Sequence, residues 1–168
     1  MWNEDMISPN HFTVLRKIHA RLSGSGIHWL VTGSLGAALQ GVPFEVHDID
    51  IQTDAAGAYE IERRFAECVT NKVAFSTYQN MRSHFGALAI DGIKVEIMGD
   101  IQLQRDDGTW EDPVDLNRYR VSVEVEGMPI PVVSLERESY AYSKLGRIEK
   151  AVLLGQWLQD HPRSNLDG

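Results

Sequence analysis

Two short stretches of this chain carry acidic residues at a spacing that could bind a divalent metal ion. Asp48 and Asp50 alternate with isoleucines in Asp48-Ile49-Asp50-Ile51, and a third carboxylate, Glu96, lies in a later apolar run. In a β-strand, side chains two residues apart leave the same face, about 6.5–7 Å apart along the strand. Carboxylates placed in this way suit Mg²⁺, which binds them together with substrate phosphates. Asp48, Asp50 and Glu96 are therefore candidate metal ligands.

A glycine-serine pair, Gly33-Ser34, precedes the acidic strand and could bind the phosphates. We expect it to open a short helix, whose N-terminal N–H groups and dipole would face an anion. Three carboxylates on neighbouring strands repel one another unless a cation neutralises them. Such a set can hold two metal ions about 3.5–4 Å apart, which bind the attacking and leaving oxygens of a phosphoryl or nucleotidyl transfer. The combination favours a site for a nucleoside triphosphate and two Mg²⁺ ions over the alternative, in which Asp48 and Asp50 merely face solvent.

Turn residues and apolar periodicity predict the elements that must position these side chains. We expect helices at about 9–22, 35–40, 54–68 and 134–159, and strands at about 27–31, 48–53, 72–78, 84–90, 93–98, 121–125 and 128–133. Asp91-Gly92 is a strong signal for a two-residue hairpin, which places Glu96 on its second arm. The prolines at 129 and 131 indicate an edge strand. The last helix is expected to bury a stripe of Ala141, Leu145, Ile148, Val152 and Leu153.

This order of elements predicts an α+β fold, a mixed twisted sheet flanked by helices. At 168 residues the chain is expected to be a single domain, with a core of about 27–133 and a C-terminal helix of about 134–159.

Composition limits the class of protein further. The net charge is -8, and the 16 lysines and arginines form no basic cluster, which argues against nucleic acid as the main partner. No apolar run approaches the roughly 18 residues that a membrane span needs, and the N-terminus lacks the pattern of a signal peptide. The single cysteine, Cys68, permits no internal disulfide and is expected to be a buried apolar residue. We therefore expect a cytoplasmic protein with no membrane partner.

The stretch from Trp29 to Met98 resembles the nucleotidyltransferase superfamily, which includes DNA polymerase β. Members share a Gly-Ser or Gly-Gly helix start, an Asp-X-Asp strand and a third acidic residue on a later strand. The corresponding residues here are Gly33-Ser34, Asp48-Ile49-Asp50-Ile51 and Glu96. The chain is similar to small, single-domain bacterial members, and nearest in layout to the lincosamide nucleotidyltransferases, which share a Trp-Leu strand, a His-Asp-Ile-Asp run and an Asp-Gly loop.

The resemblance implies a role for each of these residues. Asp48 and Asp50 would hold the metal ions, and Glu96 would either bind the catalytic metal or take the proton from an acceptor hydroxyl. Gly33-Ser34 would bind the triphosphate. Many relatives place arginine and threonine shortly before the first aspartate, where this chain has Phe-Glu-Val at 44–46. One phosphate contact is therefore missing or supplied elsewhere.

Two further residues, Arg82 and Lys144, are assigned to nucleotide binding. Arg82 could contact phosphate, and its alternative is a surface arginine. Lys144 could match a lysine that contacts the triphosphate in relatives, and its alternative is a solvated helix face. His47 is expected to point away from Asp48, because strand side chains alternate.

The predicted function is Mg²⁺-dependent transfer of a nucleoside monophosphate from a nucleoside triphosphate to a hydroxyl acceptor, with release of pyrophosphate. The acceptor could be a small molecule or a side chain of a partner protein. One alternative is a non-enzymatic nucleotide-binding module of the same fold, and another is a toxin–antitoxin protein whose main role is partner binding. The complete set of Asp48, Asp50 and Glu96 favours the enzyme. The sequence identifies neither the acceptor nor the preferred triphosphate, and it leaves open whether the chain forms a homodimer.

Overall fold

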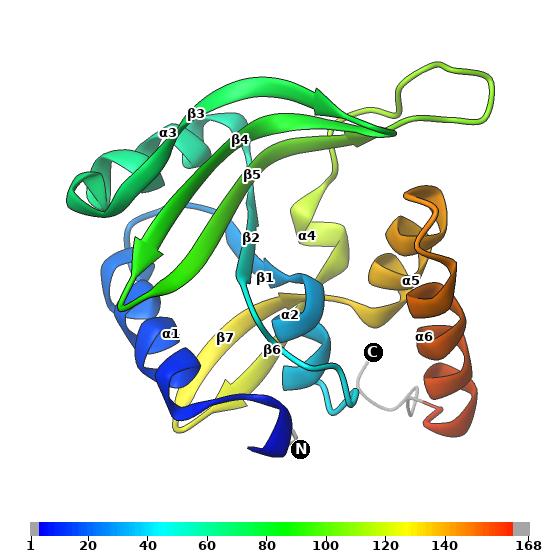
Figure 1. Cartoon of the computed structure of the whole chain (residues 1–168), viewed down its shortest axis with the longest axis horizontal. Helices are drawn as coiled ribbons and strands as arrows, with labels where there is room; N and C mark the ends of the chain where they lie inside the picture. The colour runs from blue at the N-terminus through cyan, green and yellow to red at the C-terminus, as the bar shows by residue number, and fades with distance from the viewer. Residues whose placement is uncertain (1–3, 163–168) are drawn as a thin grey trace.

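A mixed β-sheet of seven strands forms the centre of the molecule (Figure 1). The structure is a computed structural model that describes residues 4–162. Its strands are β1 (Trp29–Thr32), β2 (Ile49–Thr53), β3 (Val69–Tyr78), β4 (Met81–Ile90), β5 (Ile93–Leu103), β6 (Arg120–Val125) and β7 (Met128–Val133). Its helices are α1 (Pro9–Leu22), α2 (Gly33–Leu39), α3 (Ala55–Arg64), α4 (Leu116–Tyr119), α5 (Leu135–Lys144) and α6 (Ile148–Asp160), with short 3₁₀ turns at Glu4–Met6 and Ala66–Cys68.

The strand order is β3-β4-β5-β2-β1-β7-β6. β1 runs antiparallel to β2, whereas β2 is parallel to β5 and β1 is parallel to β7. The predicted α+β fold with a mixed sheet is therefore confirmed. Figure 1 shows α5 and α6 side by side, on the opposite side of the molecule from α1 and α3. Within residues 4–162, none of the helices is both long and apolar enough to cross a membrane.

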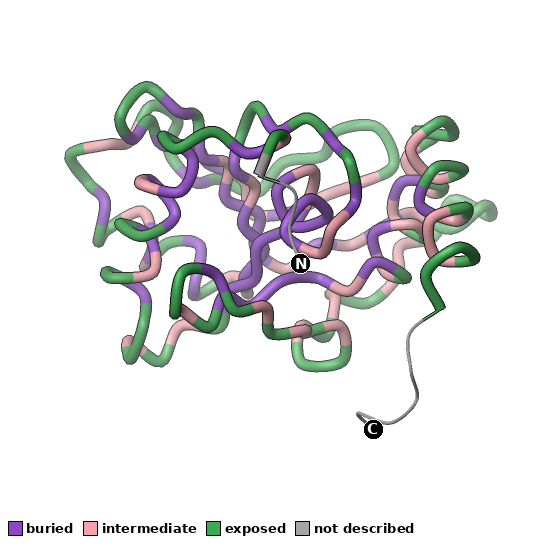
Figure 2. Tube along the Cα trace, turned by 90° about the horizontal axis from the view of Figure 1, so that it is seen from below, coloured by how far each residue is buried: buried purple, intermediate pink, exposed green. Residues whose placement is uncertain are grey.

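The first helix shows how the sequence builds the core. Ser8 caps α1, because its side chain accepts a hydrogen bond from the backbone N–H of His11. Phe12, Leu15 and Ile18 follow helical spacing and are buried. Burial of such a side chain contributes about 1.5–3 kcal/mol relative to leaving it exposed. Figure 2 shows the buried segments gathered in the middle of the molecule and the exposed ones around it.

The hairpin between β4 and β5 forms where the sequence predicts it. Asp91 and Gly92 both have positive φ, 50° and 79°, as a two-residue hairpin turn of the I′ type requires. β5 also pairs with β2 in parallel, and in that register Asp50 lies opposite Glu96. The hairpin and the parallel pairing together bring two of the three predicted carboxylates to neighbouring positions of the sheet.

The single C-terminal helix expected at 134–159 is wrong, because the chain forms two helices there. α5 ends at Lys144, Gly146 follows with a φ of 74°, and the next helix begins at Ile148. The N–H of Arg147 donates to the carbonyl of Tyr142 and that of Gly146 donates to Ser143, which is the Schellman arrangement. The expected apolar stripe is broken as well, since Ile148, Val152 and Leu153 are exposed.

The edge position expected for the proline-containing strand is also wrong. β7 lies between β1 and β6, so that β3 and β6 form the two edges of the sheet. The parallel pairing of β7 with β1 is short, with Val31 and Val132 as its one registered pair. β7 therefore needs few backbone hydrogen bonds on the side of β1, which suits prolines because they have no N–H to donate. Cys68 is only partly buried, although it packs against the main apolar core.

Candidate active site

The candidate active site is built on three adjacent strands of the sheet. In register, Thr32 of β1 lies opposite Asp50 of β2, and Asp50 lies opposite Glu96 of β5. Residues paired in this way present their side chains on the same face of a sheet. Asp48 precedes the first residue of β2 and is exposed. All four side chains line one cavity of about 690 Å³, together with Gly33 and Ser34.

Asp50 is the most perturbed of these carboxylates. Burial is the main reason that its pKa is raised to about 7, and the neighbouring carboxylates of Glu96, Glu138 and Asp48 raise it further. Its Oδ1 is buried without a hydrogen-bond partner among the described residues. A buried, unpartnered carboxylate oxygen beside other carboxylates is costly unless a cation or a proton neutralises it. The donor set therefore fits a divalent cation that prefers oxygen ligands.

The side chains of the three predicted ligands do not converge on one point. Within residues 4–162, no three carboxylate, histidine or cysteine groups are arranged as a preformed metal site. Glu96 is paired instead with Lys94, whose Nζ lies 3.1 Å from Oε1 of Glu96. This contact is the main cause that raises the pKa of Lys94, and Asp48 and Asp50 add to it. The structure thus brings Asp50 and Glu96 together, and it places Asp48 at the same cavity.

The Gly33-Ser34 turn lies directly beside Asp50. Gly33 has a φ of 68°, and a Cβ atom at this position would overlap the Asp50 carboxylate. Thr32 precedes α2 as its N-cap residue, but its side chain makes no capping hydrogen bond. The N-terminus of α2 is thus not capped by Thr32, and Ser34 follows at the cavity surface. The Gly33 N–H already donates to Glu138, so that a phosphate bound here would depend on the N–H groups that follow Gly33.

Sequence reasoning missed one carboxylate of the site, Glu138 on α5. Only 4% of Glu138 is exposed, and its Oε1 accepts hydrogen bonds from the Thr32 hydroxyl and from the Gly33 N–H, the latter at 3.2 Å. Gln52 completes this buried network by donating to the Thr32 Oγ1 at 3.2 Å. Burial raises the pKa of Glu138 to about 7, against the effect of the two hydrogen bonds. A signal was present in the sequence, because Glu138 lies one helical turn before the apolar Ala141.

The two predicted nucleotide-binding cations lie outside the cavity lining. The Arg82 guanidinium stacks on Trp110, 4.5 Å from the ring centroid, and its Nε donates to Gln102. The Nζ of Lys144 lies 3.5 Å from the Asp106 carboxylate. The roles of Arg82 and Lys144 stay predictions, for which the structure offers no contact with the cavity.

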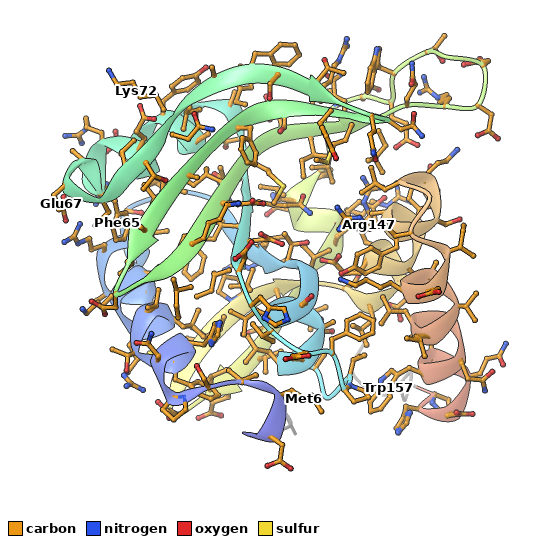
Figure 3. All side chains as sticks on the ribbon, viewed as in Figure 1. Met6, Phe65, Glu67, Lys72, Arg147 and Trp157 are labelled. Atoms are coloured by element: carbon orange, nitrogen blue, oxygen red, sulfur yellow. The ribbon has the colours of Figure 1, made fainter. Side chains whose placement is uncertain are left out.

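Three other cationic side chains line the cavity instead of Arg82 and Lys144. Arg137, Arg147 and Lys150 line it from α5, α6 and the junction between these helices. Arg147, labelled in Figure 3, lies on the side of these helices that faces the rest of the molecule. His47 also lines the cavity, whereas Trp29 is buried in the main core. The break between α5 and α6 at Gly146, which the sequence did not predict, sets the positions of Arg147 and Lys150.

Comparison with known proteins identifies the family. Residues 14–162 match the model of the aminoglycoside-2''-adenylyltransferase family. The crystal structure of TM1012, a candidate nucleotidyltransferase from Thermotoga maritima, is similar to the chain at 63% identity and a TM-score of 0.81, over 93% of this chain and 97% of that one. No curated protein matches the chain significantly.

Two more distant structures share the fold. The lincosamide antibiotic adenylyltransferase LnuA, solved with lincomycin, matches at 14% identity and a TM-score of 0.55, over 89% of this chain and 97% of that one. ANT(2'')-Ia, solved with adenylyl-2''-tobramycin, matches at 15% identity and a TM-score of 0.58, over 89% and 90%. The resemblance to nucleotidyltransferases is thus confirmed, and the chain belongs to the aminoglycoside-2''-adenylyltransferase family.

Proposed function

We propose that the protein transfers a nucleoside monophosphate from a nucleoside triphosphate to a hydroxyl group, with Mg²⁺ as cofactor and pyrophosphate as the second product. The observation that carries this proposal is the register of β2 and β5, which sets Asp50 beside Glu96 in the cavity that Gly33 and Ser34 also line. Carboxylates on one wall and phosphate-binding N–H groups on the next are the two parts that nucleotidyl transfer requires.

Different residues of the cavity have different roles in this reaction. The acceptor oxygen attacks the α-phosphorus, the bond from that phosphorus to the bridging oxygen breaks, and pyrophosphate leaves with the electron pair. Glu96 takes the proton of the acceptor hydroxyl, and Asp48 and Asp50 would hold the Mg²⁺. Bound Mg²⁺ supplies Lewis-acid stabilisation of the charge on the phosphates.

The phosphates of the nucleotide lie against the start of α2 and the cations of the helical pair. Ser34 lines the cavity, and Arg137, Arg147 and Lys150, which line it too, supply positive charge. These three cations compensate for the Phe-Glu-Val run at 44–46, where many relatives carry a phosphate-binding arginine. The family model and LnuA are described as adenylyltransferases, and ANT(2'')-Ia was solved with an adenylylated tobramycin, which supports ATP as the nucleotide.

Pyrophosphate release tests the proposal. The protein is incubated with Mg²⁺, a low-molecular-weight bacterial extract as a pool of acceptors, and ATP, GTP, CTP or UTP in turn. We expect release with ATP above the others, and its loss in Glu96→Gln. Glu124→Gln is the matched control, because Glu124 is an exposed carboxylate of β6 that does not line the cavity. Nucleotide binding without pyrophosphate release from any of the four would favour a non-enzymatic binding module.

A further inference from the structure

The cavity has two chemically different parts. Its charged lining residues belong to the acidic strands, the first turn of α5 and the start of α6. Apart from Ser83 and Glu96, the side chains that β4 and β5 contribute form an apolar wall, which consists of Met81, Phe85, Met98, Ile101 and Leu103. Ala141 of α5 and Leu145, which directly follows α5, pack against this wall. Met81, Phe85, Ala141 and Leu145 are only partly buried, so apolar surface remains open to the cavity.

The position of the apolar wall relative to the carboxylates assigns it to the acceptor. Met98 lies two residues after Glu96 on the same face of β5, and Phe85 of β4 pairs with Met98. The strand order runs from β1, which leads into the Gly33-Ser34 turn, through β2 and β5 to β4. The attacking and leaving oxygens of phosphoryl transfer lie roughly in line. If pyrophosphate leaves toward the turn, the acceptor enters from beyond Glu96, where the apolar wall begins.

The charge of this part of the cavity limits what can bind there. The remaining lining residues contributed by β3 and β4 are Ser76, Thr77, Tyr78 and Ser83, and none is charged. An ammonium group close to Glu96 would have a carboxylate partner, but the further ammonium groups of a polyamine would lose their hydration against the methionine and phenylalanine side chains, which is costly. Hydroxyl groups of the acceptor, in contrast, could bind to Ser76 and Ser83.

We infer that the acceptor is a small hydroxyl compound with an apolar body and at most one positive charge, and that a polyamino sugar is not the substrate of this chain. The inference rests on the proposed nucleotidyl transfer, because the direction of attack assigns the apolar wall to the acceptor. In the transfer, one hydroxyl oxygen of this compound forms the new bond to the α-phosphorus, its proton passes to Glu96, and pyrophosphate leaves.

A neutral apolar dye tests the inference without knowledge of the natural acceptor. N-phenyl-naphthylamine is titrated by fluorescence into the protein with and without a saturating non-hydrolysable ATP analogue. We expect one dye molecule per chain in both cases, and about tenfold weaker binding in Phe85→Gln and Met98→Gln, because each removes apolar contact area. Phe75→Gln is the control, since Phe75 is an exposed aromatic residue of β3 that does not line the cavity.

Competition of the dye with the ATP analogue and with a polyamino sugar separates the possible outcomes. Displacement of the dye by the ATP analogue would show that the apolar wall binds the base, and would overturn the inference. Displacement by neamine, a polyamino sugar, or no dye binding by the folded protein would overturn it too. Titration calorimetry with the ATP analogue alone reports on the proposed function separately. A protein that binds the dye but no nucleotide would contradict the proposed function while keeping the apolar pocket.

Discussion

The side chain of Asp50 carries an electrostatic cost that the proposed metal would remove. Its pKa in the folded protein, about 7, lies above the ordinary 3.8, so that the folded state binds more protons than the unfolded state between these values. The stability contributed by the protonated form is present at low pH, and it is lost as the pH rises from about 4 to 7. Above that window the ionised carboxylate opposes folding unless a cation is bound.

We therefore predict that Asp50→Asn stabilises the metal-free protein at pH 8 and abolishes pyrophosphate release. The expected gain is on the order of 1–3 kcal/mol, since an uncharged amide avoids the repulsion from Glu96 and Glu138. Thermal melts between pH 4 and pH 8 without Mg²⁺ measure it, and the pH dependence of the melting temperature should be weaker in the variant. A large loss of stability would mean that Asp50 has a structural role instead.

Gly33 gives a second prediction at this scale. Gly33→Ala should weaken the binding of an ATP analogue by about tenfold or more, because the new Cβ would push against the Asp50 carboxylate and alter the turn. Gly108→Ala is a matched control. Gly108 also has a positive φ, 86°, but a Cβ there would meet nothing within 4 Å. Titration calorimetry on both variants separates backbone strain from the collision, and equal affinities would show that Gly33 is only a turn residue.

Among the elements, α5 is tied to the phosphate-binding turn by Glu138. Glu138→Ala leaves the Thr32 hydroxyl and the Gly33 N–H without their acceptor in a buried setting, which costs about 1–3 kcal/mol. We predict a lower melting temperature and a raised KM for the nucleotide, with a smaller change in kcat. Glu138→Gln keeps an acceptor oxygen and should restore most of both. Equal losses in the two variants would show that the negative charge, rather than the hydrogen bonds, is what matters.

The strands and turns that carry local signals could be predicted from the sequence. The Asp91-Gly92 pair gives the position of the turn between β4 and β5. The alternation of acidic and apolar residues around Asp50 gives the position of β2. The break at Gly146 could not be recognised in the same way, because apolar residues continue at helical spacing on both sides of it. Glu138 was missed because its partners, Thr32 and Gly33, are more than a hundred residues away in sequence.

At the scale of the whole molecule, the active site is an assembly of distant segments on one mixed sheet. Residues 32–34, 48–50 and 96 come from the sheet and from the start of α2, and the cations come from residues 137–150. The carboxylates could be named from the sequence, because motif and strand period act locally. The cations could not, since the packing of α5 and α6 decides which side chains reach the cavity. The apolar wall likewise depends on the β4–β5 register.

The fate of the γ-phosphate of ATP tests the central claim most directly. The protein is incubated with Mg²⁺, γ-labelled ATP and the low-molecular-weight bacterial extract, and the labelled products are separated. Nucleotidyl transfer requires that the label leaves as pyrophosphate, that release stops without Mg²⁺, and that it is lost in Glu96→Gln but kept in Glu124→Gln. Label recovered as inorganic phosphate or on the acceptor, from an active preparation, would show cleavage at the γ-phosphorus and would contradict the account.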